Sequence, residues 1–547
     1  MKVNIQDHLE KSLALAVFIV TVGSTPFFSY DPINIPRFSF LVISGLYVAY
    51  QILLNKKQLN LINNKFITIF LLLFTILLLF SMIKSGMPWS EKIYGVEGRN
   101  TGTITYLMLV IILIGSLLSN SRILGRKLVW ALNATGVISA FYGLIQILGQ
   151  DPFDWINPYS PVFGFFGNPN FFASFIGIAA AGAINKVLNK TTSISNKVFW
   201  LLLLFLYILN IYKSKSQQGF LVLLTVCITS VFLWLRTNEK FSKFTFAYLI
   251  VVFFGVTAIL LDIFQKSPWQ SYLYKQSVTF RGDYWQAGWK MATENPITGV
   301  GLDGYRDEYR AALEFSRAAR TGSGEVVDSA HNVFIDIASG GGFILLFTYV
   351  VILLLATKSI QVKIKSQSEF DSVFATLLAA WLGYIVQSSI SINQIGLAIW
   401  GWSLTGYLLS QKNEFLDDNN TRLKLTRPKY VLFLAPFLIL SLVITVPIVR
   451  SDYEYRSAAK SGDVIRIEKS IQNFPNSVIK YNYIAQLFES NGFPDRSIVI
   501  ARQAIKVNPK NYEAWQTLLQ MSKATEQEKE KAKLMMNLLN PNLALFK

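Results

Sequence analysis

Long hydrophobic runs separated by short polar segments recur along most of the chain. Runs of roughly 17 to 25 apolar residues are long enough to cross a bilayer core of ~30 Å as α-helices. The ~10-residue alternation of membrane β-barrels is absent from the sequence. The pattern therefore predicts an all-α polytopic membrane protein of about thirteen transmembrane helices. They are centred near residues 20, 46, 74, 110, 138, 179, 204, 227, 254, 347, 383, 402 and 439.

The basic residues favour one orientation of these spans. The net charge is +18, but many of the lysines and arginines lie in alternate short loops, as in the positive-inside pattern of membrane proteins. This distribution argues against nucleic acid as a partner. With the N-terminus in the cytoplasm, four polar features fall on the outer face. They are the loop around Arg99, the loop that ends at Asn170, the turn from Lys213 to Gln217, and residues 265–330.

The last part of the chain is polar and contains a faint repeat of 34 residues. Phe474-Pro475-Asn476 recurs as Asn508-Pro509-Lys510, and Tyr481 recurs as Trp515. That period is typical of tetratricopeptide (TPR) helix pairs. We therefore expect a membrane domain over residues 1–450 and a TPR-like helical domain on the outer side over residues 451–547. The tail is interpreted either as a docking surface for a protein partner or as a helical cap.

Two common kinds of site are not supported by the sequence. Residues 299–304 spell G-x-G-x-x-G, but a dinucleotide site needs a preceding strand and a βαβ unit. Here the motif follows Asn295-Pro296 in an outer loop whose residues 284–293 and 304–319 resemble interfacial amphipathic helices. One usable histidine, the apolar Cys227 and no clustered carboxylates give no metal-ligand set. We expect metal-independent chemistry without a cofactor.

The strongest chemical candidate is a histidine where the long outer loop re-enters the membrane. The chain has two histidines, and the other, His8, lies in the polar N-terminal lead. Histidine takes and gives protons near neutrality, so His331 is a candidate general base, with Asn332 beside it. The alternative role for His331 is that of a polar residue satisfied at the start of a helix.

Cations on the same face suggest a phosphate-bearing substrate. Arg281, Arg99, Lys213 and Lys215 would stabilise a diphosphate, although interfacial arginines also serve as simple membrane anchors. Nucleotide sugars and ATP are normally absent outside the cell, so an activated sugar donor must arrive there on a lipid. A polyprenyl diphosphate glycan fits, because its leaving group needs no acid and only the acceptor hydroxyl needs a base, His331.

Several motifs occur in one order between residues 95 and 350. They are Gly98-Arg99-Asn100-Thr101-Gly102, Phe166-Gly167-Asn168-Pro169-Asn170, Arg281-Gly282-Asp283-Tyr284-Trp285, Asn295-Pro296-Ile297-Thr298-Gly299-Val300-Gly301, and Ala330-His331-Asn332-Val333-Phe334 followed by Gly340-Gly341-Gly342. Together they resemble the O-antigen ligase and polymerase superfamily of bacterial membrane glycosyltransferases, which includes O-oligosaccharyltransferases and is GT-C-like.

The resemblance implies an inverting transfer of a glycan from undecaprenyl diphosphate to an acceptor hydroxyl at the outer face of the bacterial cytoplasmic membrane. His331 would be the catalytic base and Arg281 a diphosphate ligand. The other candidate substrate-binding residues are Arg99, Lys213, Lys215, Gln217, Asn168, Asn170, Asn332 and Tyr284. One position departs from the family, because Gln217 stands where an arginine is usual.

Three functions remain open from the sequence. The first is a ligase or oligosaccharyltransferase that moves a finished glycan to a lipid or protein acceptor. The second is a polymerase that joins repeat units on the lipid carrier. The third is a transporter or lipid flippase, which should carry paired charges or broken helices near mid-bilayer. Few charges lie at the span centres, so the first two are favoured.

Overall fold

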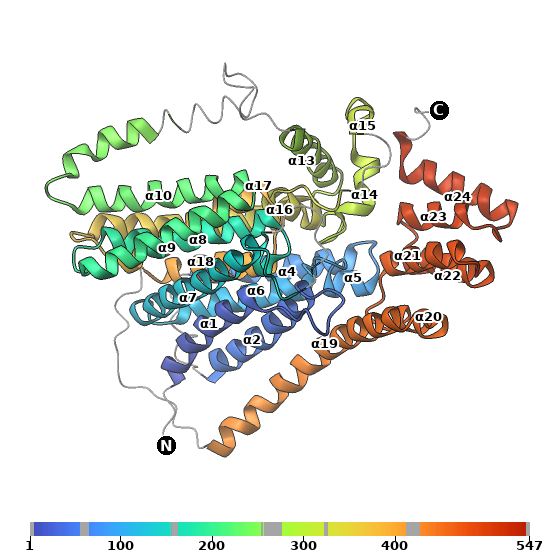
Figure 1. Cartoon of the computed structure of the whole chain (residues 1–547), viewed down its shortest axis with the longest axis horizontal. Helices are drawn as coiled ribbons and strands as arrows, with labels where there is room; N and C mark the ends of the chain where they lie inside the picture. The colour runs from blue at the N-terminus through green and yellow to red at the C-terminus, as the bar shows by residue number, and fades with distance from the viewer. Residues whose placement is uncertain are drawn as a thin grey trace.

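A computed structural model describes residues 5–54, 65–153, 155, 162–252, 255, 276–321, 327–411 and 427–542. All regular secondary structure in these residues is helical, which confirms the predicted all-α class. Most of the span expected near residue 254 and the first part of the loop 265–330 lie outside the described residues. Figure 1 shows a bundle of long helices with a set of shorter helices at one end.

Nine of the described helices are long and apolar enough to cross a membrane. They are α2 (Asn34–Leu54), α4 (Lys65–Lys84), α7 (Ser121–Ile147), α8 (Pro169–Leu188), α9 (Ile194–Lys213), α10 (Gln217–Thr237), α16 (Val333–Ser366), α17 (Ser372–Ile390) and α19 (Arg427–Ser461). Three more pack among them, α1 (Ile5–Val22), α6 (Thr103–Leu118) and α18 (Ile395–Ser410). The chain is thus a multi-pass helical membrane protein, and the number thirteen stays a prediction.

The centre of the bundle is α18, in which every residue is buried. A Cβ on Gly406 would lie 2.2 Å from the carbonyl oxygen of Leu113, so α18 and α6 touch backbone to backbone there. Small residues allow such close approach between membrane helices. The indole of Trp400 donates to Thr21 at 2.8 Å, which satisfies a polar group inside the apolar core. Helix α18 is therefore a buried central helix against which its neighbours pack.

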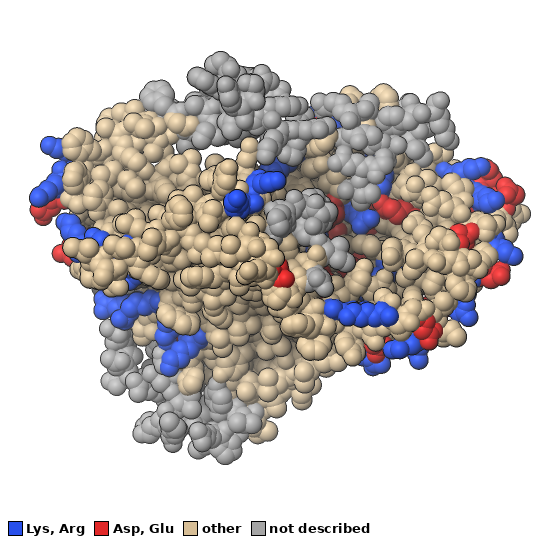
Figure 2. Space-filling view, viewed as in Figure 1, with Lys and Arg blue, Asp and Glu red and all other residues tan. Residues whose placement is uncertain are grey.

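Basic residues gather at one end of the bundle. They lie where α7 and α9 begin and where α8, α10 and α16 end, and they are Arg122, Arg126, Lys127, Lys186, Lys197, Arg236, Lys363 and Lys365. Figure 2 shows this end as a blue rim on the left. The opposite end carries α5 (Trp89–Tyr94), α13 (Gln276–Glu294), α14 (Tyr305–Ala312) and α15 (Phe315–Thr321). Helices are present at both places expected in the long loop, but residues 304–319 form two helices, α14 and α15, instead of one.

The glycine-rich turn between α13 and α14 packs directly on α16. The N–H of Val300 donates to the carbonyl of Ser339 at 2.8 Å, and the N–H of Gly301 donates to that of Gly340 at 3.0 Å. Gly342 has φ +82° and interrupts α16, because no helix continues through that conformation. The freed N–H of Phe343 bonds to the carbonyl of Pro296 at 2.8 Å. The G-x-G-x-x-G motif is therefore a turn that packs on α16.

The C-terminal helices form a unit with its own hydrophobic core. They are α20 (Val464–Ile471), α21 (Val478–Ser490), α22 (Pro494–Val507), α23 (Tyr512–Gln520) and α24 (Glu526–Leu539). Helix α19 runs without interruption across the boundary expected after residue 450, so the last membrane helix leads directly into this unit. The 34-residue period fits the pairs α21/α22 and α23/α24, and a TPR-like fold stays a prediction.

The C-terminal helices are fastened to α14 by charged and polar contacts. The carboxylate of Glu513 lies 2.9 Å from Arg310 and 3.7 Å from Arg306. Asp307 accepts hydrogen bonds from the amides of Asn508 at 2.7 Å and Asn511 at 3.0 Å. Because Arg310 is 7% exposed, this contact is largely shielded from solvent. The C-terminal unit and α14 therefore hold each other in place.

We expect Glu513→Ala to weaken this attachment by about 3 kcal/mol, the cost of leaving a buried arginine without its partner. The measurement is thermal unfolding of the full chain in nanodiscs, together with the rate of proteolysis in the C-terminal unit. Lys523→Ala removes an exposed ion pair with Asp495 and should change little. Equal effects of the two variants would contradict a shielded attachment.

Candidate functional site

His331 stands immediately before the first turn of α16 in a constrained backbone conformation. Its φ of +52° is a left-handed value that side chains other than glycine rarely adopt. Asn332 caps α16, since its side-chain oxygen accepts from the N–H groups of Phe334 and Ile335 at 3.0 and 3.3 Å. The N–H of His331 donates to the hydroxyl of Ser329 at 3.0 Å. Strained backbone held by neighbours is often found at functional sites.

Aromatic side chains from the long loop form one wall beside His331. The ring centroid of Tyr284, on α13, lies 5.7 Å from that of His331. Tyr284 contacts Tyr309 edge-on, and Tyr305 stacks on Tyr309, both from α14. The hydroxyl of Tyr305 donates to the carbonyl of Tyr284 at 2.6 Å, which joins the two helices. The structure therefore brings together two residues that the sequence proposed separately, His331 and Tyr284.

Burial and nearby cations keep the imidazole of His331 neutral. Burial, together with the charges of Arg99 and Arg281, lowers the pKa of His331 to about 4, and Asp328 opposes this shift. Its ring nitrogens make no hydrogen bond to the described residues. A neutral imidazole with an available nitrogen is the state that a general base requires before it accepts a proton.

Arg281 lies on α13 one turn before Tyr284, whose ring is 5.7 Å from that of His331, and the charge of Arg281 lowers the pKa of His331. The side chain of Arg281 is partly buried, and that burial lowers its pKa. Within the described part of the chain no carboxylate pairs with Arg281. A partly desolvated guanidinium without an anion is suited to bind phosphate oxygens through two parallel hydrogen bonds. Arg281 is thus the cation beside His331 that is available to a ligand.

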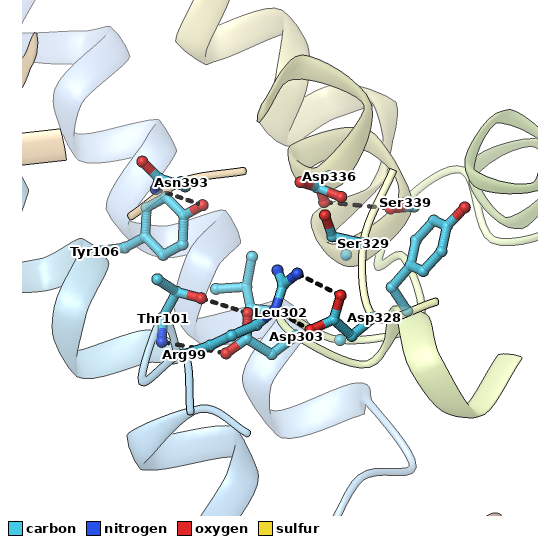
Figure 3. A pocket seen from close by; sticks show the side chains of 13 residues that line it. Arg99, Thr101, Tyr106, Leu302, Asp303, Asp328, Ser329, Asp336, Ser339 and Asn393 are labelled. Atoms are coloured by element: carbon cyan, nitrogen blue, oxygen red, sulfur yellow. Dashed lines mark hydrogen bonds and ion pairs between the residues drawn. The ribbon is translucent and has the colours of Figure 1, made fainter. Parts of the chain in front are cut away.

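Arg99 differs from Arg281, because its guanidinium is paired with the carboxylate of Asp328. Its Nε and Nη2 donate to the two carboxylate oxygens of Asp328 at 2.8 and 2.6 Å. Figure 3 shows this pair in a cavity that also contains Asp303 and Asp336. Asp303 accepts from the backbone N–H groups of Val96 and Thr101, which fixes the turn that carries Arg99. The assignment of Arg99 to the substrate stays a prediction.

Three acidic residues at this site were not singled out in the sequence. Asp328 neutralises Arg99, Asp303 anchors the Arg99 turn, and Asp336 accepts from the N–H of Ala330 at 2.8 Å. These contacts depend on the fold and cannot be read from the sequence. The one sequence feature that could have pointed to a site residue is the position of Asp328, three residues before His331. Among the described residues, no group of histidine, cysteine and acidic side chains has the arrangement of a metal site.

The remaining candidates form a separate cluster at the starts of α8 and α10. Asn168 caps α8 by accepting from the N–H of Asn170, and Asn170 accepts from the hydroxyl of Ser216 at 2.8 Å. Lys213, Lys215 and Gln217 are exposed. No described contact joins this cluster to His331, so its part in substrate binding stays a prediction.

Comparison with known proteins adds one match. Residues 202–350 match the family model described as O-antigen ligase. The matched segment contains Arg281, Tyr284, His331 and the paired glycine-rich segments, whereas Arg99, Asn168 and Asn170 lie outside it. The match supports the superfamily that the sequence motifs resemble. No curated protein matches the chain.

The electrostatics of the site can be tested by titration. In a His8→Ala background the signal of His331 is isolated, and nitrogen-15 NMR of histidine-labelled protein should show a pKa near 4. Arg281→Gln should raise this pKa by removing a cation, and Asp328→Asn should lower it by removing the opposing carboxylate. Arg502→Gln, in the C-terminal unit, is the control. Shifts of the same sign in both site variants would contradict this arrangement.

Proposed function

We propose that this member of the O-antigen ligase and polymerase superfamily transfers a glycan from a polyprenyl diphosphate, undecaprenyl diphosphate in bacteria, to an acceptor hydroxyl. The observation that carries the proposal is the pair on α13 and α16: Arg281 without a carboxylate partner in the described chain, beside His331 with a neutral imidazole. A cation for the departing diphosphate and a base for the incoming hydroxyl are the two groups that this reaction needs.

The steps follow from these groups. The acceptor oxygen attacks the anomeric carbon as its proton passes to a ring nitrogen of His331. The bond from that carbon to the diphosphate oxygen breaks on the opposite face, which inverts the configuration. The diphosphate leaves with the electron pair, and Arg281 stabilises the added charge. Arg99 binds the same diphosphate only if its ion pair with Asp328 breaks. Otherwise its positive charge acts on the diphosphate from a distance.

Donor binding would also strengthen the base. Arg99 and Arg281 depress the pKa of His331. A diphosphate bound at Arg281 places negative charge beside the same imidazole and offsets that effect, so the pKa of His331 rises toward neutrality. A base whose pKa lies nearer the working pH accepts a proton more readily. The donor therefore activates the residue that completes the transfer.

The proposed function also implies an orientation of the protein in the membrane. The basic end of the bundle faces the cytoplasm, in line with the positive-inside pattern, and α5, α13, α14 and the C-terminal helices face outward. The site then lies where lipid-linked glycans are delivered. About thirteen spans and a TPR-like tail complete this topology. A polymerase that adds repeat units to a lipid-linked acceptor uses identical chemistry and is the alternative.

We expect His331→Ala and His331→Asn to reduce transfer by about 10²–10⁴-fold, the usual contribution of a general base. The assay mixes purified protein in nanodiscs with lipid-linked glycan and acceptor, in the presence of chelator, and follows products by mass spectrometry. His8→Ala, which removes the other histidine, should transfer normally. Normal turnover in either His331 variant would end the general-base assignment.

We expect Arg281→Lys to weaken donor binding by about ten- to a hundredfold, since a point charge replaces a bidentate fork. Binding of the lipid-linked donor to the nanodisc-embedded variant gives this value directly. Arg450→Lys, at an exposed position of α19, is the matched control. Donor affinity equal to that of the unmodified chain would remove Arg281 from the diphosphate site.

The transfer assay also separates the two enzymatic alternatives. Donor supplied alone should give a ladder of lengthening lipid-linked chains if the protein is a polymerase. One glycan on an added lipid or peptide, without a ladder, identifies a ligase or oligosaccharyltransferase.

A further inference from the structure

A second polar cavity lies between the membrane domain and the C-terminal helices. It contains about 430 Å³ of empty space, part of it open to solvent. Ser90, Glu91 and Asn100 line it from the membrane domain, and Asn476, Ser477 and Lys480 line it from the C-terminal unit. None of these residues belongs to the His331 site. The cavity exists only because the two units are docked together.

Buried hydrogen-bond acceptors in this cavity lack partners. The side-chain oxygen of Asn100, a residue that is 3% exposed, and Oε2 of Glu97 are both buried without a hydrogen-bond donor among the described residues. Leaving such atoms unpaired costs free energy of about 1–3 kcal/mol each. Both atoms therefore favour a ligand that brings donors, such as hydroxyl or amide groups, into the cavity.

The charges of the cavity are internally compensated. The ammonium of Lys480 lies 3.0 Å from Glu97 and over the ring of Tyr455. Burial raises the pKa of Glu91 to about 8, with Asp307 and Asp303 adding to the effect. Glu91 is thus mainly an uncharged carboxylic acid at neutral pH, and the lining carries no net charge. Such a lining has no excess charge to bind either a phosphate or a free cation.

The cavity adjoins the cavity around Arg99 through one turn of chain. Arg99 and Thr101 line the cavity of Figure 3, whereas Gly95, Glu97 and Asn100 of the same turn line the second cavity. Asn100 adopts φ +56°, so neighbouring residues of this turn point into different spaces. A ligand that spans both cavities would place one end near Arg99 and the other near Asn100.

We propose that this second cavity binds uncharged sugar residues, through hydroxyl and acetamido groups that donate to Asn100 and Glu97 and accept from Lys480 and Glu91. The link between this cavity and glycan transfer rests on the proposed function, whereas the binding of sugars to the cavity does not. The sugars belong either to the donor glycan or to a glycan acceptor. On this assignment the C-terminal unit supplies part of a saccharide subsite, through Asn476 and Ser477.

The test uses full-length protein in nanodiscs and saturation-transfer NMR with the methyl glycosides of glucose, galactose, mannose, N-acetylglucosamine and N-acetylgalactosamine. We expect a signal from at least one glycoside, reduced at least fivefold by Asn100→Gly and by Asn476→Ala. Glycine keeps the left-handed backbone of position 100. Asn491→Ala, an exposed amide of the C-terminal unit, and His331→Ala should bind as the unmodified chain does.

No signal from any glycoside, or equal signals from the unmodified chain, Asn100→Gly and Asn476→Ala, would overturn the proposal. Because free sugars bind without a transfer step, loss of transfer in the His331 variants and loss of binding here are separate results. In the transfer assay, a raised KM for the lipid-linked donor in Asn476→Ala assigns the cavity to the donor glycan. A raised KM for a glycan acceptor assigns it to the acceptor.

Discussion

The candidate site depends on a contact between two glycine-rich backbones. A Cβ on Gly299 would lie 2.3 Å from the carbonyl carbon of Gly340, and one on Gly342 would lie 2.6 Å from the backbone of Ile297. Hydrogen bonds between the segments replace the helical bonds that Gly342 interrupts. This contact fixes where α13 ends relative to the start of α16. The spacing of Arg281, Tyr284 and His331 follows from it, since Arg281 and Tyr284 lie on α13 and His331 lies two residues before α16.

Charge balance is the second constraint, and it explains why one arginine is paired and the other is not. Two free guanidinium groups beside a buried imidazole would depress its pKa further and repel each other. Asp328 pairs with Arg99 at 2.6 Å and opposes its effect on the pKa of His331. Arg281 keeps its charge available. On the proposed mechanism, Arg281 offsets only part of the charge of a bound diphosphate, so negative charge remains beside His331 and raises its pKa.

The sequence predicted the features that have a local cause. Apolar runs gave the membrane helices, and the two ends of one outer loop had to return to the same face, which placed Arg281 and His331 together. It did not predict that Asp328 pairs with Arg99, because the choice of ion partners across 229 positions has no local pattern. Asn170 and the Lys213 turn were expected at the same site, but their contacts join α8 to α10. Shared location on a membrane face does not decide which side chains meet.

The position of the C-terminal helices bears on what they do. In a TPR-like array that recruits a partner, the loops and inner faces are left open. Here the segment from Asn508 to Glu513 is engaged by α14, and Asn542 donates to the carbonyl of Leu313. Helix α14 also supplies Tyr305 and Tyr309, which support Tyr284 beside His331. A change in how the C-terminal unit contacts α14 would therefore also change how Tyr305 and Tyr309 support Tyr284. In the described residues, the surface of the unit that contacts α14 is therefore not open to a partner protein.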